Sequence, residues 1–357
     1  MKNEIKEILL NLKYVNYTKN FINEKNIRSI LIKEDKVEIS IELNFPIVLL
    51  SKEFKVLIEE SLIDLVKLPL KINLTQKIKS HQAQKGISKI DGVKNVIAVA
   101  SGKGGVGKSS TAVNLALALL NEGAKVGILD ADIYGPSQPQ MLGINQKPES
   151  KDGKSMEPLI AHGLQIMSIG FLVDQETPMI WRGPMVTSTL EQLLKETNWS
   201  DLDYLIIDLP PGTGDIQLTL AQKIPVTGAI IVTTPQDIAL LDARRGLKMF
   251  EKVNVPIIGI VENMTTHICS NCGHEEHIFG LGGGNKMSED YDTLLLGSLP
   301  LDISIRENLD NGTPSVSIDP NNKISKIYQS IAQKVAFKVS ELTEDPGSKF
   351  PKIVIKN

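Results

Sequence analysis

The chain has 357 residues, of which 41% are hydrophobic, and its 39 basic and 42 acidic residues leave a net charge of -3. This length and composition allow a large buried core divided between about two domains. The charge gives no general attraction to nucleic acid or anionic lipid, and no segment approaches the roughly 20 apolar residues of a membrane span or the apolar core of a signal peptide. We therefore expect a soluble, cytoplasmic protein with no nucleic-acid or membrane partner.

Residues 1–80 are expected to form a small α+β domain. The segment KVEISIEL (36–43) alternates apolar and polar residues, which is typical of a half-buried strand. Apolar residues then recur at helical spacing from Phe54 to Val66. The stretch 81–95 is polar and contains two glycines, as expected of a linker between domains.

Beyond this linker, short apolar runs alternate with helical patterns, which is typical of buried parallel strands in an α/β protein. Two segments, 237–253 and 324–339, are predicted as helices. The fold class predicted for residues 96–342 is therefore α/β, with a mostly parallel sheet flanked by helices, and the tail 343–357 is expected to be mobile. The predicted strands are residues 96–101, 125–130, 204–210, 228–235, 257–264 and 293–300.

A phosphate-binding loop is predicted directly after the first of these strands. SGKGGVGKSS (101–110) fits the Walker pattern G-x-x-x-x-G-K-[ST] with Gly102, Gly107, Lys108 and Ser109. Glycines let backbone N–H groups surround the phosphates, Lys108 can reach the terminal phosphates, and the Ser109 hydroxyl can hold Mg²⁺. We therefore predict ATP and Mg²⁺ as ligands. The remaining residues predicted to bind the nucleotide in this loop are Lys103, Gly104, Gly105, Val106 and Ser110.

The loop contains a second lysine, Lys103, before its central glycines. The loop wraps a single phosphate chain, so Lys103 cannot share the position of Lys108. One use for Lys103 is to reach phosphates that are bound by another subunit. On spacing alone, the alternative of a solvated loop lysine is favoured.

Carboxylates end two further predicted strands. Asp208 in LIIDLPPGTGD is placed to hold the Mg²⁺ shell, and Gly212 lets the backbone approach a γ-phosphate. Asp130 and Asp132 in GILDADIYGPS lie on a loop that could position or polarise the attacking water. A single aspartate at a strand end is usually a cap or turn residue, but three beside a Walker loop indicate a site, because open α/β sheets bind ligands at this edge.

The chain has two cysteines, Cys269 and Cys272, within HICSNCGHEEHIFG (267–280). A disulfide between two cysteines this close would close a very short loop and add little stability. Reduced thiols instead favour metal or redox chemistry. A tetrahedral metal site needs about four ligands, so one chain supplies half of a four-thiolate site. A two-fold dimer that brings both pairs to its axis would suit a bridging [4Fe–4S] cluster.

Zinc is the alternative metal, because three histidines flank the thiols. These are His267, His274 and His277, and Cys₂His₂ zinc sites are common. His274 follows Cys272 too closely for the spacing of a zinc finger, so a site within one chain would be cramped. Zinc in a dimeric four-cysteine site stays open.

Taken in order, six motifs resemble those of the Mrp/ApbC family of iron–sulfur cluster carrier ATPases, which are P-loop relatives of MinD, ParA and the nitrogenase iron protein. The motifs are KGGVGKS with its extra lysine (a deviant Walker loop), DADIYGPSQP, DLPPGTGD, TTPQDIALLDARRG, ENM and CSNCG, and they cover roughly residues 90–340. Residues 1–80 resemble the small domain that often precedes the ATPase in this family. That domain commonly carries a cysteine, which LNFPIVLL lacks here.

The resemblance implies specific roles for residues of this sequence. It implies a homodimer in which Lys103 acts across the interface, Asp132 supports hydrolysis and Asn263 of ENM contacts adenine. It also implies a labile [4Fe–4S] cluster at Cys269 and Cys272, taken from an assembly scaffold and passed to apo iron–sulfur proteins. The rival function is a positioning ATPase of MinD/ParA type, for which a basic amphipathic C-terminal helix or a basic DNA-facing patch would be expected.

Overall fold

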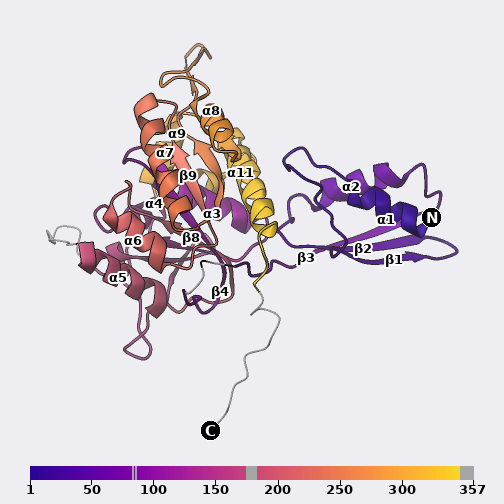
Figure 1. Cartoon of the computed structure of the whole chain (residues 1–357), viewed down its shortest axis with the longest axis horizontal. Coiled ribbons are helices and arrows are strands. Elements are labelled where there is room, and N and C mark those ends of the chain that lie inside the picture. Colours follow the sequence, from indigo (N-terminus) through magenta and orange to yellow (C-terminus); the bar gives the residue numbers. More distant parts are fainter. Residues whose placement is uncertain (83, 85–86, 174–182, 270, 346–357) are drawn as a thin grey trace, which may run out of the picture.

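The structure is a computed structural model, and it describes residues 1–82, 84, 87–173, 183–269 and 271–345 (Figure 1). A small amino-terminal unit lies to one side of a larger α/β body, and helix α11 (Lys323–Ser340) lies on the side of that body that faces it. No helix in the described part of the chain combines the length and the apolar composition needed to cross a membrane.

The amino-terminal unit is a three-stranded sheet with two helices. Strand β1 pairs antiparallel with β2, and β2 pairs parallel with β3. Side chains of β2 alternate between buried and half-buried, as the sequence pattern predicts. The elements are α1 (Lys2–Leu10), β1 (Ile27–Ile32), β2 (Val37–Leu43), α2 (Ser51–Leu62) and β3 (Leu70–Gln76).

The larger body is built on an eight-stranded sheet with the order β13-β10-β9-β4-β8-β5-β7-β6. All neighbouring strands are parallel except β6 and β7. The prediction of a mostly parallel sheet is confirmed, and each predicted strand is present. These strands are β4 (Val93–Ser101), β5 (Val126–Asp130), β8 (Leu202–Asp208), β9 (Gly228–Thr233), β10 (Ile257–Glu262) and β13 (Leu295–Ser298).

Two strands at one edge of the sheet were not expected from the sequence. They are β6 (Leu159–Ala161) and β7 (Leu164–Ser168), which form a tight antiparallel pair. The outer strand β6 is only partly buried, so its sequence lacks the continuous apolar run of the central strands.

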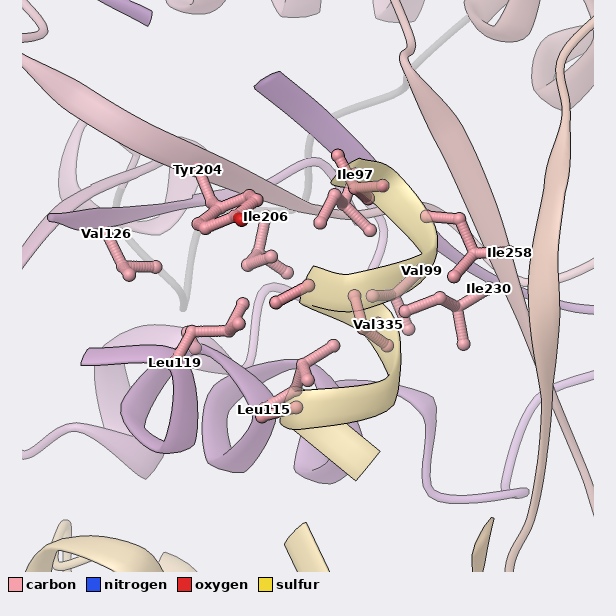
Figure 2. Close-up of a cluster of buried hydrophobic side chains, with 14 of the residues drawn as sticks. Ile97, Val99, Leu115, Leu119, Val126, Tyr204, Ile206, Ile230, Ile258 and Val335 are labelled. Carbon is pink, nitrogen blue, oxygen red and sulfur yellow. The ribbon is translucent and has the colours of Figure 1, made fainter. Parts of the chain in front are cut away.

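Helices cover both faces of this sheet. The chain moves toward one edge of the sheet from β4 to β5 and β7, and toward the other edge from β8 to β9 and β10. Right-handed crossovers therefore place α3 on one face and α6 and α7 on the other. Figure 2 shows Leu115 and Leu119 of α3 and Val335 of α11 packed over Ile206 and Ile230 of the sheet. The helices are α3 (Lys108–Asn121), α4 (Gln138–Met141), the 3₁₀ turn η1 (Ile169–Phe171), α5 (Gly183–Glu196), α6 (Asp215–Lys223), α7 (Asp237–Lys252), α8 (Gly283–Asp290), α9 (Ile303–Asp310) and α10 (Ser315–Ile318).

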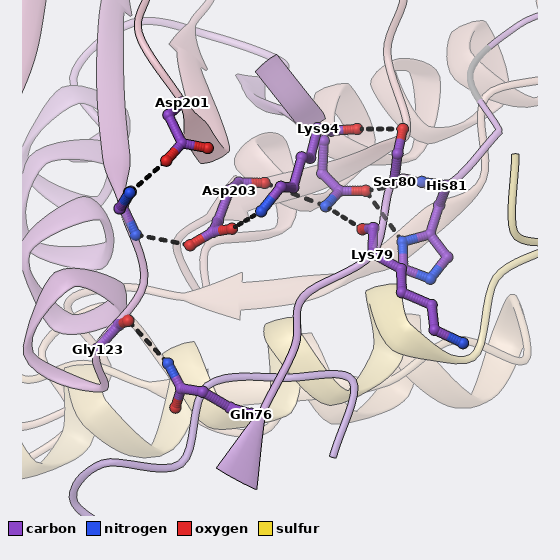
Figure 3. A network of polar contacts seen from close by, with 10 residues as sticks. Gln76, Lys79, Ser80, His81, Lys94, Gly123, Asp201 and Asp203 are labelled. Atoms are coloured by element: carbon purple, nitrogen blue, oxygen red, sulfur yellow. Dashed lines mark hydrogen bonds and ion pairs between the residues drawn. The ribbon is translucent and has the colours of Figure 1, made fainter. Parts of the chain in front are cut away.

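The predicted linker 81–95 is more ordered at its ends than its composition indicates. His81 is buried, and its Nδ1 atom lies 3.0 Å from Oδ1 of Asn95, which already belongs to β4 (Figure 3). Residues 343–345 of the predicted mobile tail hydrogen-bond to this segment, since the Gln82 N–H donates to the carbonyl oxygen of Thr343 at 2.9 Å. The rest of that tail, residues 346–357, lies outside the described residues.

Candidate functional site

The Walker loop joins the end of β4 to the start of α3, in the order that the sequence predicts. Gly105 and Gly107 have φ values of 79° and 82°, in the left-handed region that favours glycine. A Cβ atom on Gly107 would lie 2.1 Å from Nδ2 of Asn263. The loop therefore requires glycine here, and its conformation suits backbone N–H groups that surround an anion.

Lys108 lies at the centre of the carboxylates that were predicted to form the site. Its Nζ atom is 2.5 Å from Oδ1 of Asp208, 3.8 Å from Oδ2 of Asp132 and 3.2 Å from Oγ of Ser109. The side chains of Lys108 and Asp208 are both buried. The structure thus brings together Lys108, which was predicted to be catalytic, the two candidate magnesium residues and Asp132.

Asp130 supports the same cluster from the end of β5. It is fully buried and accepts hydrogen bonds from the backbone N–H of Asp132 at 3.2 Å and of Gln138 at 3.1 Å, and from Oγ of Ser168 at 3.1 Å. Burial, followed by repulsion from Asp208, raises the pKa of Asp130. Burial also raises the pKa of Asp132, and the positive charge of Lys108 opposes part of this rise.

Two residues of this network, Gln138 and Ser168, were not singled out from the sequence. The Gln138 Nε2 atom donates to Oδ2 of Asp208 at 3.0 Å and to the carbonyl oxygen of Ser109 at 3.2 Å. Gln138 is part of the DADIYGPSQP motif, whose sequence alone assigns it no role, whereas Ser168 belongs to no motif. The signal for Ser168 is its place at the carboxyl end of β7, where open α/β sheets bind ligands.

The remaining loop residues lie around the phosphate-binding turn. The Gly212 N–H donates to the carbonyl oxygen of Ser101 at 2.9 Å, which holds the DLPPGTGD segment against the Walker loop. Lys103 is half-buried and makes no ion pair with any residue that the structure describes. Other predicted members differ in exposure, with Gly104 and Gly105 exposed, Gly102 and Ser110 half-buried, and Val106 buried.

Asn263 links the loop to the segment that carries the cysteines. It follows β10, and its Nδ2 atom donates to the carbonyl oxygen of Val106 at 2.9 Å. Its Oδ1 atom accepts from the backbone N–H of Met264 at 2.9 Å. The side chain that the family resemblance assigns to adenine therefore lies on the nucleotide loop itself.

The two cysteines lie on an antiparallel hairpin formed by β11 (His267–Ile268) and β12 (Glu275–Glu276). Cys272 is exposed and Cys269 is half-exposed. The pKa of the Cys269 thiol is lowered, chiefly because the backbone N–H groups of Cys272 and Asn271 donate to it. A lowered pKa favours the thiolate, which is the metal-binding form of cysteine.

The flanking histidines do not complete a metal site within the described part of one chain. Nδ1 of His267 lies 3.2 Å from the carbonyl oxygen of Leu301, and Nδ1 of His277 lies 2.8 Å from that of Thr265. Across the described residues, no three Cys, His, Asp or Glu side chains are grouped so that they could hold one metal ion. The described part of one chain therefore offers two thiols on this hairpin and no third ligand beside them.

A glycine-rich loop with a buried lysine and strand-end carboxylates, placed at the carboxyl edge of a parallel sheet, defines a P-loop NTPase. The family model described as "ParA: NUBPL iron-transfer P-loop NTPase" matches residues 92–336. The chain belongs to this family, which confirms the resemblance stated from the motifs.

Curated relatives agree with this assignment. The iron-sulfur cluster carrier protein of Escherichia coli K12 is 63% identical over 264 residues, which are 74% of this chain and 72% of that protein. The protein of the same name from Haemophilus influenzae is 50% identical over 337 residues, 94% of this chain and 91% of that one. The iron-sulfur cluster transfer protein NUBPL of Mus musculus is 51% identical over 257 residues, covering 71% and 81%.

Solved structures give the same fold. A nucleotide-binding protein from Archaeoglobus fulgidus in complex with ADP has a TM-score of 0.56 and 37% identity, covering 62% of this chain and 88% of that one. The cell division ATPase MinD of Pyrococcus furiosus has a TM-score of 0.51 at 21% identity, covering 68% and 98%, and so shows the fold alone.

Proposed function

We propose that this chain is a magnesium-dependent ATPase that carries a [4Fe–4S] cluster between two copies of itself and delivers it to apo iron–sulfur proteins. The description of the matched family includes iron transfer, and the relatives above are named as iron–sulfur cluster carrier or transfer proteins. The proposed cluster source is an assembly scaffold, and the proposed compartment is the cytoplasm, where thiols stay reduced.

The observation that carries this proposal is the half-site on the hairpin. Cys269 and Cys272 are accessible, and the described residues of the same chain add no third ligand. A cubane cluster takes four thiolates, and a two-fold axis beside the hairpin would supply the second pair. Exposed Ile278 and Leu281, just beyond the hairpin, provide apolar surface that a second copy could cover.

The residues around the Walker loop suit ATP hydrolysis. The open left-handed turn at Gly105 leaves room for phosphate, because a Cβ there would meet nothing within 4 Å. We assign Lys108 to the phosphates, Ser109 and Asp208 to Mg²⁺, and Asp132 to the attacking water. Bound Mg²⁺ would neutralise negative charge on the phosphates. Lys103 makes no ion pair within the described residues, so its charge is available to a nucleotide in the partner subunit.

The two sites are connected through one short segment. Asn263 binds the Walker loop, and the next residues lead directly into β11 and Cys269. The Thr265 N–H donates to the carbonyl oxygen of Leu299 at 3.0 Å, which fixes the base of the hairpin to the end of β13. A change of the loop on nucleotide binding would therefore be transmitted to the thiols over a few residues.

The test is iron, sulfide and zinc analysis of protein purified without oxygen, together with a mass measurement of the oligomer. We expect one [4Fe–4S] cluster per dimer, and loss of iron in Cys269→Ser. His274→Ala is the matched control, because His274 is exposed and its only ion pair in the described residues is with Glu276 at 3.7 Å. A monomer that binds iron equally well, or a Cys269→Ser chain that keeps it, would overturn the proposal. Zinc with little iron would support the zinc alternative instead.

A further inference from the structure

Gln138 lies at the meeting point of the residues that we assign to magnesium and to the attacking water. It is the first residue of α4 and its side chain is 0% exposed. The loop before it carries Asp132, and its own backbone N–H donates to Oδ2 of Asp130 at 3.1 Å. A buried glutamine in this position needs a reason, because burying a carboxamide is costly unless its atoms are hydrogen-bonded.

The two N–H groups of the Gln138 carboxamide connect two different elements. One reaches Oδ2 of Asp208 at the end of β8, and the other reaches the carbonyl oxygen of Ser109 in the first turn of α3. The side chain therefore sets the relative position of the two candidate magnesium residues. Gln138 does not contact the other carboxylate oxygen of Asp208, Oδ1. This oxygen accepts a hydrogen bond from Lys108 and is the one available to a metal ion.

The carboxamide oxygen of Gln138 has no partner. Oε1 is buried and makes no hydrogen bond among the described residues, and the same is true of Oγ of the preceding Ser137. An unpaired buried acceptor costs about 1–3 kcal/mol, so such atoms are rare in folded proteins. Two such atoms on adjacent residues, one of them on the side chain that donates to Asp208, indicate that this segment binds something polar when the site is filled.

We propose that Gln138 is a positioning residue that braces Ser109 and Asp208 for Mg²⁺ and whose Oε1 accepts a hydrogen bond from water in the shell of the ion. This inference rests on the proposed magnesium-dependent nucleotide binding. Gln138 also joins that site to the loop of Asp132, so displacement of the loop would disturb the magnesium residues at the same time.

The competing explanation is that Gln138 only fills space between the strands and α4. Methionine has nearly the same length and volume but cannot donate to Asp208 or accept from water. Gln138→Met therefore keeps the packing and removes the polar role. Gln138→Leu is a second variant of different shape, and Gln140→Met is the matched control, because Gln140 is exposed on the same short helix.

The experiment measures binding of a fluorescent ADP analogue as a function of Mg²⁺ concentration, with the melting temperature of each variant recorded. We expect the Mg²⁺ concentration for half-maximal tightening to rise about tenfold in Gln138→Met, while affinity without Mg²⁺ stays within about twofold. Gln140→Met should match the wild type. Unchanged Mg²⁺ dependence in both folded Gln138 variants would overturn the inference. If the wild-type protein does not bind the analogue at all, the proposed function fails instead.

Discussion

Asn263 donates a hydrogen bond from Nδ2 to the carbonyl oxygen of Val106 at 2.9 Å, so the end of β10 is tied to the Walker loop. Both residues are buried, and Gly107 beside them has no space for a Cβ because Asn263 occupies it. In the proposed function, this side chain links the nucleotide-binding loop to the segment that leads into the cysteine hairpin. It also gives the clearest way to separate the two sites experimentally.

Replacing Asn263 by alanine should weaken nucleotide binding without removing the cluster ligands. The buried carbonyl of Val106 would lose its partner, at a cost of about 1–3 kcal/mol, which corresponds to about tenfold or more in ADP affinity if the bound loop carries that cost. Iron per dimer should stay at the wild-type value after reconstitution. ADP titration and iron analysis of the same preparation test this.

Asn263→Asp is the matched variant, because its carboxylate can still accept from the Met264 N–H but cannot donate to Val106. We expect it to behave like Asn263→Ala in the ADP titration. Wild-type affinity in both variants would show that the hydrogen bond has no part in nucleotide binding.

The two lysines of the Walker loop should respond differently to removal. Lys108→Ala leaves Asp208 and Asp132 without their cation, and breaking such a buried pair costs about 3–5 kcal/mol. Lys103 has no ion pair in the described chain, so Lys103→Ala should leave the melting temperature nearly unchanged. Both variants should lower ATP turnover about a hundredfold or more, as loss of a transition-state cation does.

Turnover and thermal unfolding of the two variants, measured side by side, separate these effects. Mixing Lys103→Ala with an excess of Lys108→Ala should restore part of the turnover if Lys103 acts across the dimer, since the mixed dimer has one complete site. Full turnover in Lys103→Ala alone would show that it is a solvated loop lysine.

The parallel core could be predicted from the sequence because burial on both faces leaves continuous apolar runs. Strand β8 (Leu202–Asp208) is buried throughout, and residues 204–207 form the apolar run YLII within it. Strand β6 gave no such signal, because a short and partly exposed edge strand needs few apolar residues. Strand β7 is largely buried, but its sequence LQIMS includes the polar residues Gln165 and Ser168 and so forms no continuous apolar run. The start of β4 at Val93 and the hydrogen bond between Gln82 and Thr343 were also not predicted. Both depend on contacts between distant segments, which composition does not reveal.

The site residues that belong to motifs could be predicted, because phosphate binding imposes fixed spacing on Gly107, Lys108 and Ser109. Gln138 also stands in a motif, DADIYGPSQP, but the motif does not reveal its contact with Asp208, which is distant in sequence and meets it only in the folded chain. The burial of Glu122 could not be predicted either, because a charged residue at the end of a helix is usually exposed. Glu122 is instead fully buried, where the amino-terminal unit meets α11.

Glu122 should make stability depend on pH. It accepts hydrogen bonds from Gln333 Nε2 at 2.6 Å and from the Leu49 N–H at 3.3 Å, but burial dominates and raises its pKa from 4.5 to about 7. The folded state thus favours the protonated acid. Its stabilising effect is complete below pH 4.5 and is lost as the pH rises through about 7.

Glu122→Gln mimics the protonated acid at every pH and should remove this loss. We expect it to raise the free energy of unfolding at pH 8 by about 1–3 kcal/mol, with little effect near pH 4.5. Denaturant unfolding of the full chain at several pH values tests this, and Glu60→Gln, at an exposed position, is the control. Equal pH dependence in the wild type and Glu122→Gln would show that Glu122 is ionised in the folded protein.

The ring of Tyr17 provides a second test of how the amino-terminal unit is attached. It stacks on Phe337 of α11 with the ring centroids 4.1 Å apart and an interplanar angle of 14°. Its hydroxyl is buried without a hydrogen-bond partner among the described residues. Tyr17→Ala should therefore cost about 3–5 kcal/mol in thermal or denaturant unfolding, because it removes the stacked ring.

Tyr17→Phe keeps the ring and removes only the unpaired hydroxyl, so it should be neutral or stabilise the protein by up to about 1 kcal/mol. A loss above about 1 kcal/mol in Tyr17→Phe would mean that the hydroxyl has a partner such as bound water. Protease sensitivity of residues 1–80 should follow the same order, with Tyr17→Ala cleaved fastest. The reason is that the ring contact with Phe337 holds this unit on α11, the helix that packs against the Walker helix α3.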